Sequence, residues 1–319
     1  MKTSEIYEHV TNKIIHLLES HLEEWNKPWI SVDQDNEPAR NPGTDRYYRG
    51  INQFLLSLEL MEKGYLKNIW MTYAQISDQG GQVLKSEKAA PVIFYKTAFI
   101  DRKNKYYKPE IVKTMDLNTR IENGIDKVPI IKLYHVFNVA QTKGLPDEYY
   151  TIPEKVIELN EIQKHEAAEN LIIATGADVE YRMSNKAYFD PGSDKIVLPL
   201  REQFNSVEDL YGTSLHELIH WSGEPHRLNR IKGKVFGDQN YAGEELVAEL
   251  GSAFLCANLG ISKPITQNTA YIKNWLTVMK SNSRAIFSAS AEAGRAVDYI
   301  LELAGKSESR LELEEEFTP

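Results

Sequence analysis

His216, Glu217 and His220 form an HExxH pattern within the stretch LHELIHWSGEPH, and this spacing is typical of a metal site on a helix. Side chains four residues apart project from the same face of a helix, so both imidazoles can bind one ion. Zn2+ suits imidazole ligands and acidifies water, and Glu217 on the adjacent flank can accept a proton from that water. The pattern therefore predicts zinc-dependent hydrolysis. The alternative is that two histidines merely share a polar face of a helix.

The third protein ligand has competing candidates. HELIHWSGEPH also satisfies HExxHxxGxxH, in which Gly223 turns the chain and His226 returns to the ion, as in metzincins. Metzincins need a methionine turn, however, and Met279, which follows the motif, lies in a helical pattern. The rival is Glu245 in EELVAEL, whose spelling resembles the second metal-binding helix of gluzincins. We favour Glu245 as the ligand, with Glu249 hydrogen-bonded to a ligating histidine; His226 and Glu249 stay open as alternative ligands.

The elements that would position this site occupy the second half of the chain. A helix is expected over residues 153–175, and two short strands should flank the turn DPGSD. The helix that carries HExxH should begin near Ser206, and further helices near Tyr241 and Thr269. KIVLP at 195–199 is expected to be either an edge strand, which can hold an extended peptide by main-chain hydrogen bonds, or an ordinary hairpin strand.

The first half begins with apolar residues at helical spacing from Ile6 to Leu22, which predicts an amphipathic helix and not a signal peptide. A second helix in YYRGINQFLLSLELMEKG should end at Gly64, a C-cap glycine. Two runs rich in β-branched and aromatic residues, KSEKAAPVIFYKTAFI and VPIIKLYHVFNVAQ, predict paired strands. The polar stretch 101–126 between them is expected to be a long hairpin loop or insertion, and the sequence assigns it no role.

Charge is distributed unevenly along the chain. Residues 1–150 contain 20 Lys and Arg and 20 Asp and Glu, so residues 151–319 carry the whole net charge of −9. A sequence pI near 5.5 does not indicate the dense acidic array that a DNA mimic would need. The single cysteine, Cys256, lies in an apolar run, and a chain without a possible internal disulfide is expected in the cytoplasm.

A length of 319 residues and the Gly- and Pro-rich stretch GLPDEYYTIP predict two domains. We expect an α+β fold with a mixed α/β domain over 1–147 and a mainly helical domain with a small edge sheet over 153–306. The acidic tail 307–319 is expected to be solvated. In the first half, aromatic residues alternate with cations and amides, a pattern that suits single-stranded nucleic acid, although aromatic residues in strands more often fill a core.

Several long motifs together resemble the ArdC-type antirestriction proteins of conjugative plasmids and integrative elements. They are YRGIN, GYLKNIWMTYAQ, GGQVLKSEKAAPVIFYK and YHVFNVAQTKGLP in the first half, then LHELIHWSGEPHRLNR and YAGEELVAELGSAFL. The resemblance runs from about Ile6 to Ala296. It implies an N-terminal domain that binds single-stranded DNA, a C-terminal zincin-like metallopeptidase domain, and protection of incoming DNA from host restriction during conjugation.

Carried onto this sequence, the resemblance implies His216, His220 and Glu245 as zinc ligands and Glu217 as the general base. The positions expected to contact DNA are Tyr48, Arg49, Asn52, Trp70, Lys85, Lys88 and Lys96. One departure is Ala89, where the family usually has glycine, and it weakens any expectation of close backbone approach to phosphate there. The leading hypothesis is a DNA-tethered metallopeptidase that acts on a protein substrate. The alternative is a non-enzymatic shield for single-stranded DNA with a structural or vestigial metal site.

Overall fold

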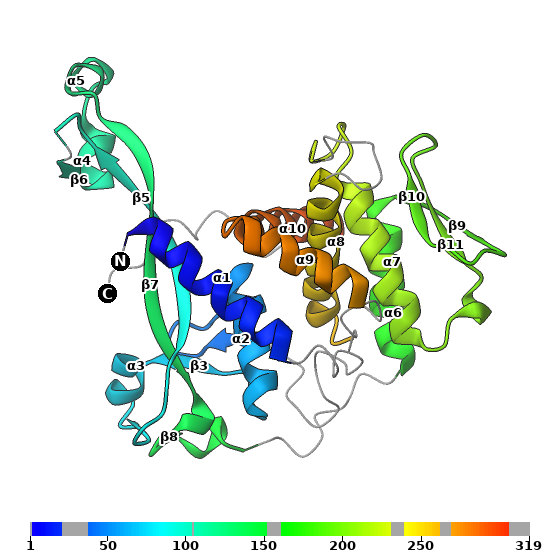
Figure 1. Ribbon diagram of the computed structural model, residues 1–319, viewed down its shortest axis with the longest axis horizontal. Helices are drawn as coiled ribbons and strands as arrows, with labels where there is room; N and C mark the ends of the chain where they lie inside the picture. The colour runs from blue at the N-terminus through cyan, green and yellow to red at the C-terminus, as the bar shows by residue number, and fades with distance from the viewer. Residues whose placement is uncertain are drawn as a thin grey trace.

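The computed structural model describes residues 2–20, 38–103, 105–151, 161–230, 239–261 and 269–305. Figure 1 shows a sheet with its covering helices at one side of the molecule and a helical part with a small sheet at the other. The expected α+β class is confirmed. Within those ranges, no helix combines the length and the apolar character that crossing a membrane requires.

A four-stranded antiparallel sheet organises the first half, in the order β3-β7-β5-β6. Strand β5 (Ala90–Ile100) pairs along its whole length with β7 (Asp126–Asn138), which confirms the two predicted strands. The short strands β3 (Trp70–Thr72) and β6 (Tyr106–Tyr107) extend the sheet at opposite edges.

Three helices accompany this sheet: α1 (Thr3–Ser20), α2 (Ile51–Lys63) and α3 (Tyr73–Asp78). Helix α1 is amphipathic as predicted and buries its apolar residues from Ile6 to Leu18. Helix α2 ends as predicted at Gly64, whose φ of 63° is a left-handed conformation that glycine adopts without strain.

Smaller elements connect these parts. The pairs are β1 (Arg40–Asn41) with β2 (Arg46–Tyr47), and β4 (Gln82–Val83) with β8 (Thr142–Lys143). Short 3₁₀ turns follow at η1 (Val139–Gln141) and η2 (Asp147–Tyr149).

Residues 101–126, the predicted insertion, form an arm that stands away from the body at the end of the β5–β7 ribbon (Figure 1). The arm contains β6 and two short helices, α4 (Pro109–Thr114) and α5 (Leu117–Asn123). The side chain of Asp116 caps the start of α5, and Gly124 closes it in a left-handed conformation. The stretch is therefore a folded structure and not only a loop.

The second half is mainly helical. Its helices are α6 (Glu161–Thr175), α7 (Val207–Ser222), α8 (Gln239–Asn258), α9 (Thr269–Ser281) and α10 (Ala285–Leu303). Ser206 caps α7 as expected, since its hydroxyl accepts a hydrogen bond from the Asp209 N–H. The expected start of α6 at Pro153 lies outside the described residues. Helix α10 was not predicted.

A three-stranded sheet lies beside α7, in the order β10-β11-β9. Its strands are β9 (Asp178–Arg182), β10 (Tyr188–Asp190) and β11 (Lys195–Pro199), and the 3₁₀ turn η3 (Arg201–Gln203) follows. The edge-strand prediction for KIVLP is wrong, because β11 is the central strand, antiparallel to β10 and parallel to β9. The continuous apolar run of β11 is consistent with a central strand, whose side chains are covered on both faces.

The two halves share one hydrophobic core, in which α1 and α2 pack with α9 and α10. The ring of Tyr7 meets that of Phe287 edge to face at 4.6 Å, and the Thr11 hydroxyl donates to the Ser283 carbonyl at 2.7 Å. The expected linker at 148–152 continues into undescribed residues, and the expected acidic tail also lies outside the described ranges. The division into domains at 1–147 and 153–306 stays a prediction.

Candidate metal centre

Two neighbouring helices bring the candidate metal ligands together: α7 carries His216 and His220, and α8 carries Glu245. The helices lie close because Gly251 has no side chain; a Cβ there would meet the Ile219 side chain at 2.7 Å. Such close packing fixes the carboxylate of α8 against the imidazoles of α7.

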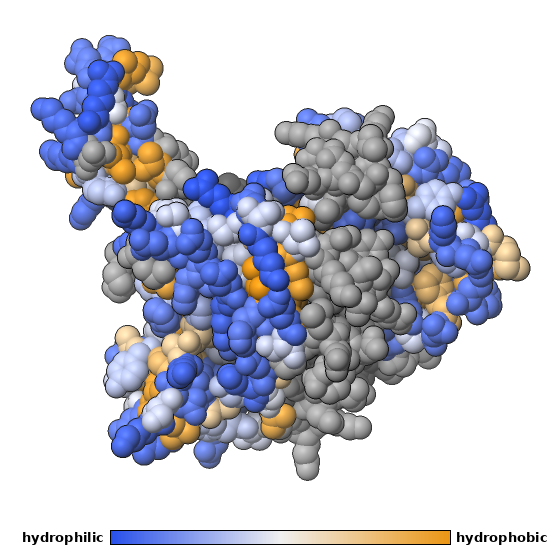
Figure 2. All heavy atoms as spheres, viewed as in Figure 1, coloured by the Kyte–Doolittle hydropathy of each residue, from blue (hydrophilic) through white to orange (hydrophobic). Residues whose placement is uncertain are grey.

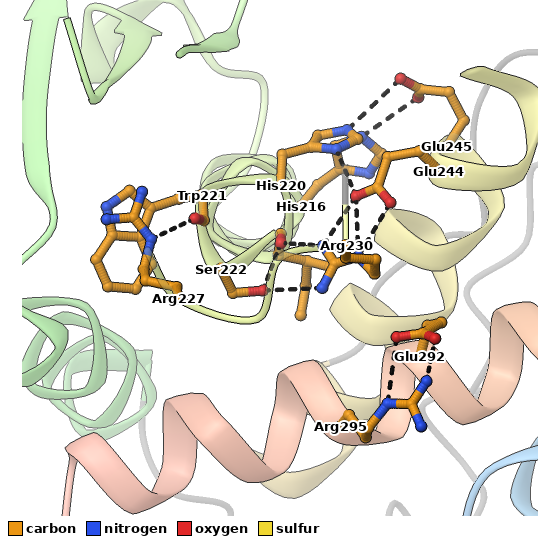
Figure 3. Close-up of polar contacts among 11 residues, drawn as sticks. His216, His220, Trp221, Ser222, Arg227, Arg230, Glu244, Glu245, Glu292 and Arg295 are labelled. Carbon is orange, nitrogen blue, oxygen red and sulfur yellow. Dashed lines mark hydrogen bonds and ion pairs between the residues drawn. The ribbon is translucent and has the colours of Figure 1, made fainter. Parts of the chain in front are cut away.

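The polar atoms of these three side chains converge on one point (Figure 3). The Nε2 atoms of His216 and His220 lie 3.2 Å apart. The carboxylate of Glu245 lies 3.6 Å from His216 Nε2 and 3.5 Å from His220 Nε2. One ligand atom from each residue falls within a group no wider than 4.8 Å. Two imidazoles and one carboxylate form a donor set that fits a divalent ion such as Zn2+.

A second layer of carboxylates contacts the outer nitrogens of both imidazoles. Glu249 Oε1 lies 3.5 Å from His216 Nδ1, which is the placement that the sequence led us to expect. On the other side, Glu244 Oε1 lies 3.3 Å from His220 Nδ1. A carboxylate at the outer nitrogen of a ligating histidine fixes its tautomer and orients its ring.

Arg230 anchors Glu244 from the loop that follows α7. Its guanidinium donates to both carboxylate oxygens of Glu244, at 3.0 and 2.8 Å, and also to the Ile219 carbonyl and the Ser222 hydroxyl (Figure 3). The Arg230 side chain is only 5% exposed. Sequence reasoning missed both residues. The available signal was the doubled glutamate EE, which places a second acid next to the expected ligand.

The charges of the site favour a cation. Burial disfavours the charged form of His220, but hydrogen bonds to Glu244 and Glu245 outweigh it and raise the pKa of His220 to about 10. Burial opposes ionisation of Glu245, yet its contacts with His216 and His220 hold the pKa of that carboxyl far below its usual range. Glu244 behaves alike: burial is outweighed by His220 and Arg230, and the pKa falls.

Glu217 lies on α7 beside the histidines and is buried. Its negative charge is close enough to contribute to the raised pKa of His220. A carboxylate held next to the ligand cluster, without being one of its members, has the placement that a general base requires.

His226 lies apart from the cluster. Its side chain is 59% exposed, and its Nε2 lies 3.3 Å from Asp194 Oδ2. Asp194 also binds the guanidinium of Arg227, which stacks 4.0 Å from the ring centre of Trp221. These contacts fasten the β10–β11 turn to the end of α7. The placement favours Glu245 over His226 as the third ligand.

Three of the residues expected to contact DNA are buried instead. Tyr48 is 7% exposed and donates its hydroxyl to the Trp70 carbonyl, while Trp70 itself is 1% exposed. Asn52 exchanges two hydrogen bonds with the backbone of Ile93, at 2.7 and 2.8 Å. These side chains hold α2, β3 and β5 together and offer no free ring face to a base, which corrects their sequence-based assignment.

The remaining DNA candidates are basic residues. Lys85 and Lys88 are exposed beside β4, and the Lys96 side chain lies outside the described parts of the structure. Arg49 forms an ion pair with Asp298 of α10, which joins the two halves of the chain. Of the seven expected DNA contacts, Lys85 and Lys88 are therefore the two whose side chains the structure shows exposed without assigning them a structural contact among the described residues.

Comparisons with known proteins find a match to one family model in each half of the chain. The family model for the N-terminal domain of anti-restriction factor ArdC matches residues 4–137, and the zincin-like metallopeptidase family model matches residues 166–292. The metal-free crystal structure of the antirestriction ArdC protein from plasmid R388 is 34% identical, with a TM-score of 0.73 over 95% of this chain and 99% of that chain. Its Mn(II)-bound structure is 32% identical, with a TM-score of 0.70 and the same coverage.

Among curated proteins, the uncharacterized protein y4eC of Sinorhizobium fredii is 33% identical over 93% of this chain and 92% of its own length. A DNA primase TraC of Escherichia coli is 32% identical over 92% of this chain. The chain spans only 27% of that primase's length. Because identity, coverage and fold agree across both halves, the chain belongs to the ArdC family of antirestriction proteins, with an N-terminal ArdC domain followed by a zincin-like metallopeptidase domain.

Proposed function

We propose that this antirestriction protein binds single-stranded DNA through its first half and hydrolyses a protein substrate through its second half. The observation that carries the proposal is the convergence of His216, His220 and Glu245, with Glu217 buried beside them. Burial of several ionisable side chains lowers the stability of a fold, so such a group is expected where it serves a function.

The two histidines and Glu245 would hold a divalent ion. When bound, that ion supplies positive charge that acidifies a water molecule and polarises the scissile carbonyl. Glu217 accepts the proton that the water loses as its oxygen attacks the carbonyl carbon, and returns a proton to the leaving amine as the C–N bond breaks. Glu244 and Glu249 hold the imidazoles in position during these steps.

Strand β10 supplies the peptide-binding edge in this proposal. It is an edge strand of the small sheet and contacts α7, the helix that carries both histidines. An extended substrate can add to such an edge by main-chain hydrogen bonds. The sequence suggested β11 for this role, but β11 is the central strand and has no free edge, so β10 takes its place in the proposal.

We propose zinc as the ion because two imidazoles and a carboxylate are its common ligands in hydrolases. The R388 relative has been crystallised with Mn(II), so manganese is the competing choice. The nucleic-acid partner is proposed from the ArdC N-terminal domain, and the setting from the plasmid origin of the R388 relative. We place the activity in the cytoplasm of a cell that receives single-stranded DNA by conjugation.

The Glu217→Gln variant tests the enzymatic proposal, because it removes the proton acceptor and leaves all proposed ligands in place. Conjugation of a plasmid that carries this gene would be counted in restriction-proficient and restriction-deficient recipients. We expect the variant to keep metal and DNA binding but to lose protection. The number of transconjugants should then fall in the restriction-proficient recipient and stay at the wild-type level in the restriction-deficient one. Glu208→Gln, at the start of the same helix, is the matched control. Full protection by Glu217→Gln would instead support the DNA shield.

A further inference from the structure

The arm carries a run of cations where the chain turns from β5 into β6. Residues 102–108 include four basic residues and no Asp or Glu, whereas the acids that follow lie between 110 and 126. The four are Arg102, Lys103, Lys105 and Lys108. Figure 2 shows the arm as a largely hydrophilic surface interrupted by a few hydrophobic side chains.

Asp101, which precedes this run, directs its charge into the backbone. Its Oδ1 accepts hydrogen bonds from the N–H groups of Lys103 and Lys105, at 2.8 and 3.0 Å. Its Oδ2 accepts one from the Tyr107 hydroxyl at 2.9 Å. These bonds, first among them that from Lys105, hold the pKa of Asp101 below its usual range. The carboxylate thereby shapes the turn; it forms no ion pair with the three lysines, and the charge of Lys105 adds only the last of the causes that lower its pKa.

The cations differ in what they contact. The Arg102 side chain packs against Gly124, where α5 ends, so closely that a Cβ at this glycine would collide with it. A cation at a helix C-terminus is favourable, so Arg102 has a structural role. Lys103, Lys105 and Lys108 are exposed, and none of them forms an ion pair with any residue in the described ranges.

Tyr106 places an aromatic ring among these cations. It is 65% exposed on the short edge strand β6, opposite Ile100 of β5. Next to it, the Lys105 ammonium lies 5.0 Å from the ring centre of Tyr107. Proteins that bind single strands combine exposed rings, on which bases stack, with exposed cations, which contact the phosphates, and this part of the arm has both.

We propose that the turn between β5 and β6 is a binding site for single-stranded DNA, in which a base stacks on Tyr106 while Lys103, Lys105 and Lys108 contact phosphates. This inference rests on the proposed function, because it names the part of the first half that holds the DNA. The arm stands away from the α7–α8 site (Figure 1), so DNA bound there leaves the metal centre open.

Two variants of the full chain test the site: Tyr106→Ala, and the triple substitution of Lys103, Lys105 and Lys108 by Gln. Affinity for a fluorescein-labelled oligothymidylate of about twenty nucleotides would be measured by anisotropy at several salt concentrations. Tyr106→Phe, which keeps the ring, and the triple substitution by Arg, which keeps the charge, are matched controls. Unchanged circular dichroism verifies that each variant is folded.

Loss of one stacking contact should weaken binding about 5- to 150-fold in Tyr106→Ala. Loss of three phosphate contacts should make binding less sensitive to salt in the triple Gln variant. The negative slope of log affinity against log salt concentration should become smaller in magnitude by about 2. Both controls should bind as the wild type does. If the wild type binds and both test variants keep its affinity and slope, the arm is not the DNA site, although the proposed function stands. A wild type that does not bind the oligonucleotide overturns both.

Discussion

The Glu244→Gln variant tests whether the orientation of the His220 ring affects metal binding. It changes a residue that contacts His220 and leaves all proposed metal ligands in place. In the structure, the Glu244 carboxylate contacts His220 Nδ1 at 3.3 Å and receives hydrogen bonds from Arg230 on both oxygens. A glutamine has a single acceptor oxygen and no charge, so it cannot accept all the hydrogen bonds that the two carboxylate oxygens of Glu244 now accept. His220 then loses the anion that fixes its ring.

The expected loss of metal affinity is about 10- to 100-fold, the usual effect of removing such an outer partner, or about 1.4 to 2.7 kcal/mol. A second effect arises because Arg230 stays buried without its counter-ion. Removal of one member of a buried ion pair costs about 3 to 5 kcal/mol. The lower end applies here, since Arg230 keeps its bonds to the Ile219 carbonyl and the Ser222 hydroxyl.

Two measurements distinguish these effects. Competition with a chromophoric chelator, well below the unfolding temperature, gives the metal affinity, and thermal unfolding of the metal-free chain gives the stability. The visible spectrum of the Co(II)-substituted protein reports whether His220 still ligates. If stability falls while affinity and spectrum stay at the wild-type values, Glu244 is only a structural anchor and the reasoning about orientation is refuted.

Three further results are expected. Gly251→Ala should destabilise the chain by about 1 to 3 kcal/mol in thermal unfolding, because α7 and α8 must move apart to make room for the added methyl group. Gly243→Ala is the control, since a Cβ there would meet open space, and it should not destabilise the chain. Equal stabilities of the two variants would contradict the argument that Gly251 permits the close approach. Elemental analysis should find about one metal ion per chain in the wild type and in His226→Ala but none in Glu245→Gln, and the reverse pattern would move the site to the metzincin arrangement. Because the raised pKa of His220, about 10, means that its imidazole must lose a proton before it can bind a metal, metal binding at neutral pH should release that proton and weaken as pH falls. Calorimetry in buffers of different ionisation enthalpy would show no proton release if this is wrong.

Local signals in the sequence were sufficient for the elements and for part of the site. The HExxH spacing, the Ser206 cap and the C-cap glycine at 64 each depend on neighbours within a few residues, and the structure has all three features. The Glu249 contact with His216 was also accessible, because both positions follow from helical periodicity once the two helices are paired.

Features that depend on distant packing were not accessible. Arg230 contacts Glu244, which lies fourteen positions further along the sequence, and no pattern in either segment indicates the other. Tyr48 and Trp70 have the residue types of a stacking surface, but their hydrogen bond closes a core that forms only after α2, β3 and β5 assemble. The central position of β11 likewise depends on its parallel pairing with β9, which a hairpin pattern does not predict.

The shared core has a consequence for how such a region can move between genes. Helices α1 and α2 complete the apolar surface of α9 and α10, so either half alone would expose side chains that the other now covers. Recombination that exchanged one half would leave this surface without its partner. The two halves should therefore be inherited together. The TraC relatives agree with this, since each matches 92% of this chain, both halves included, within a much longer polypeptide.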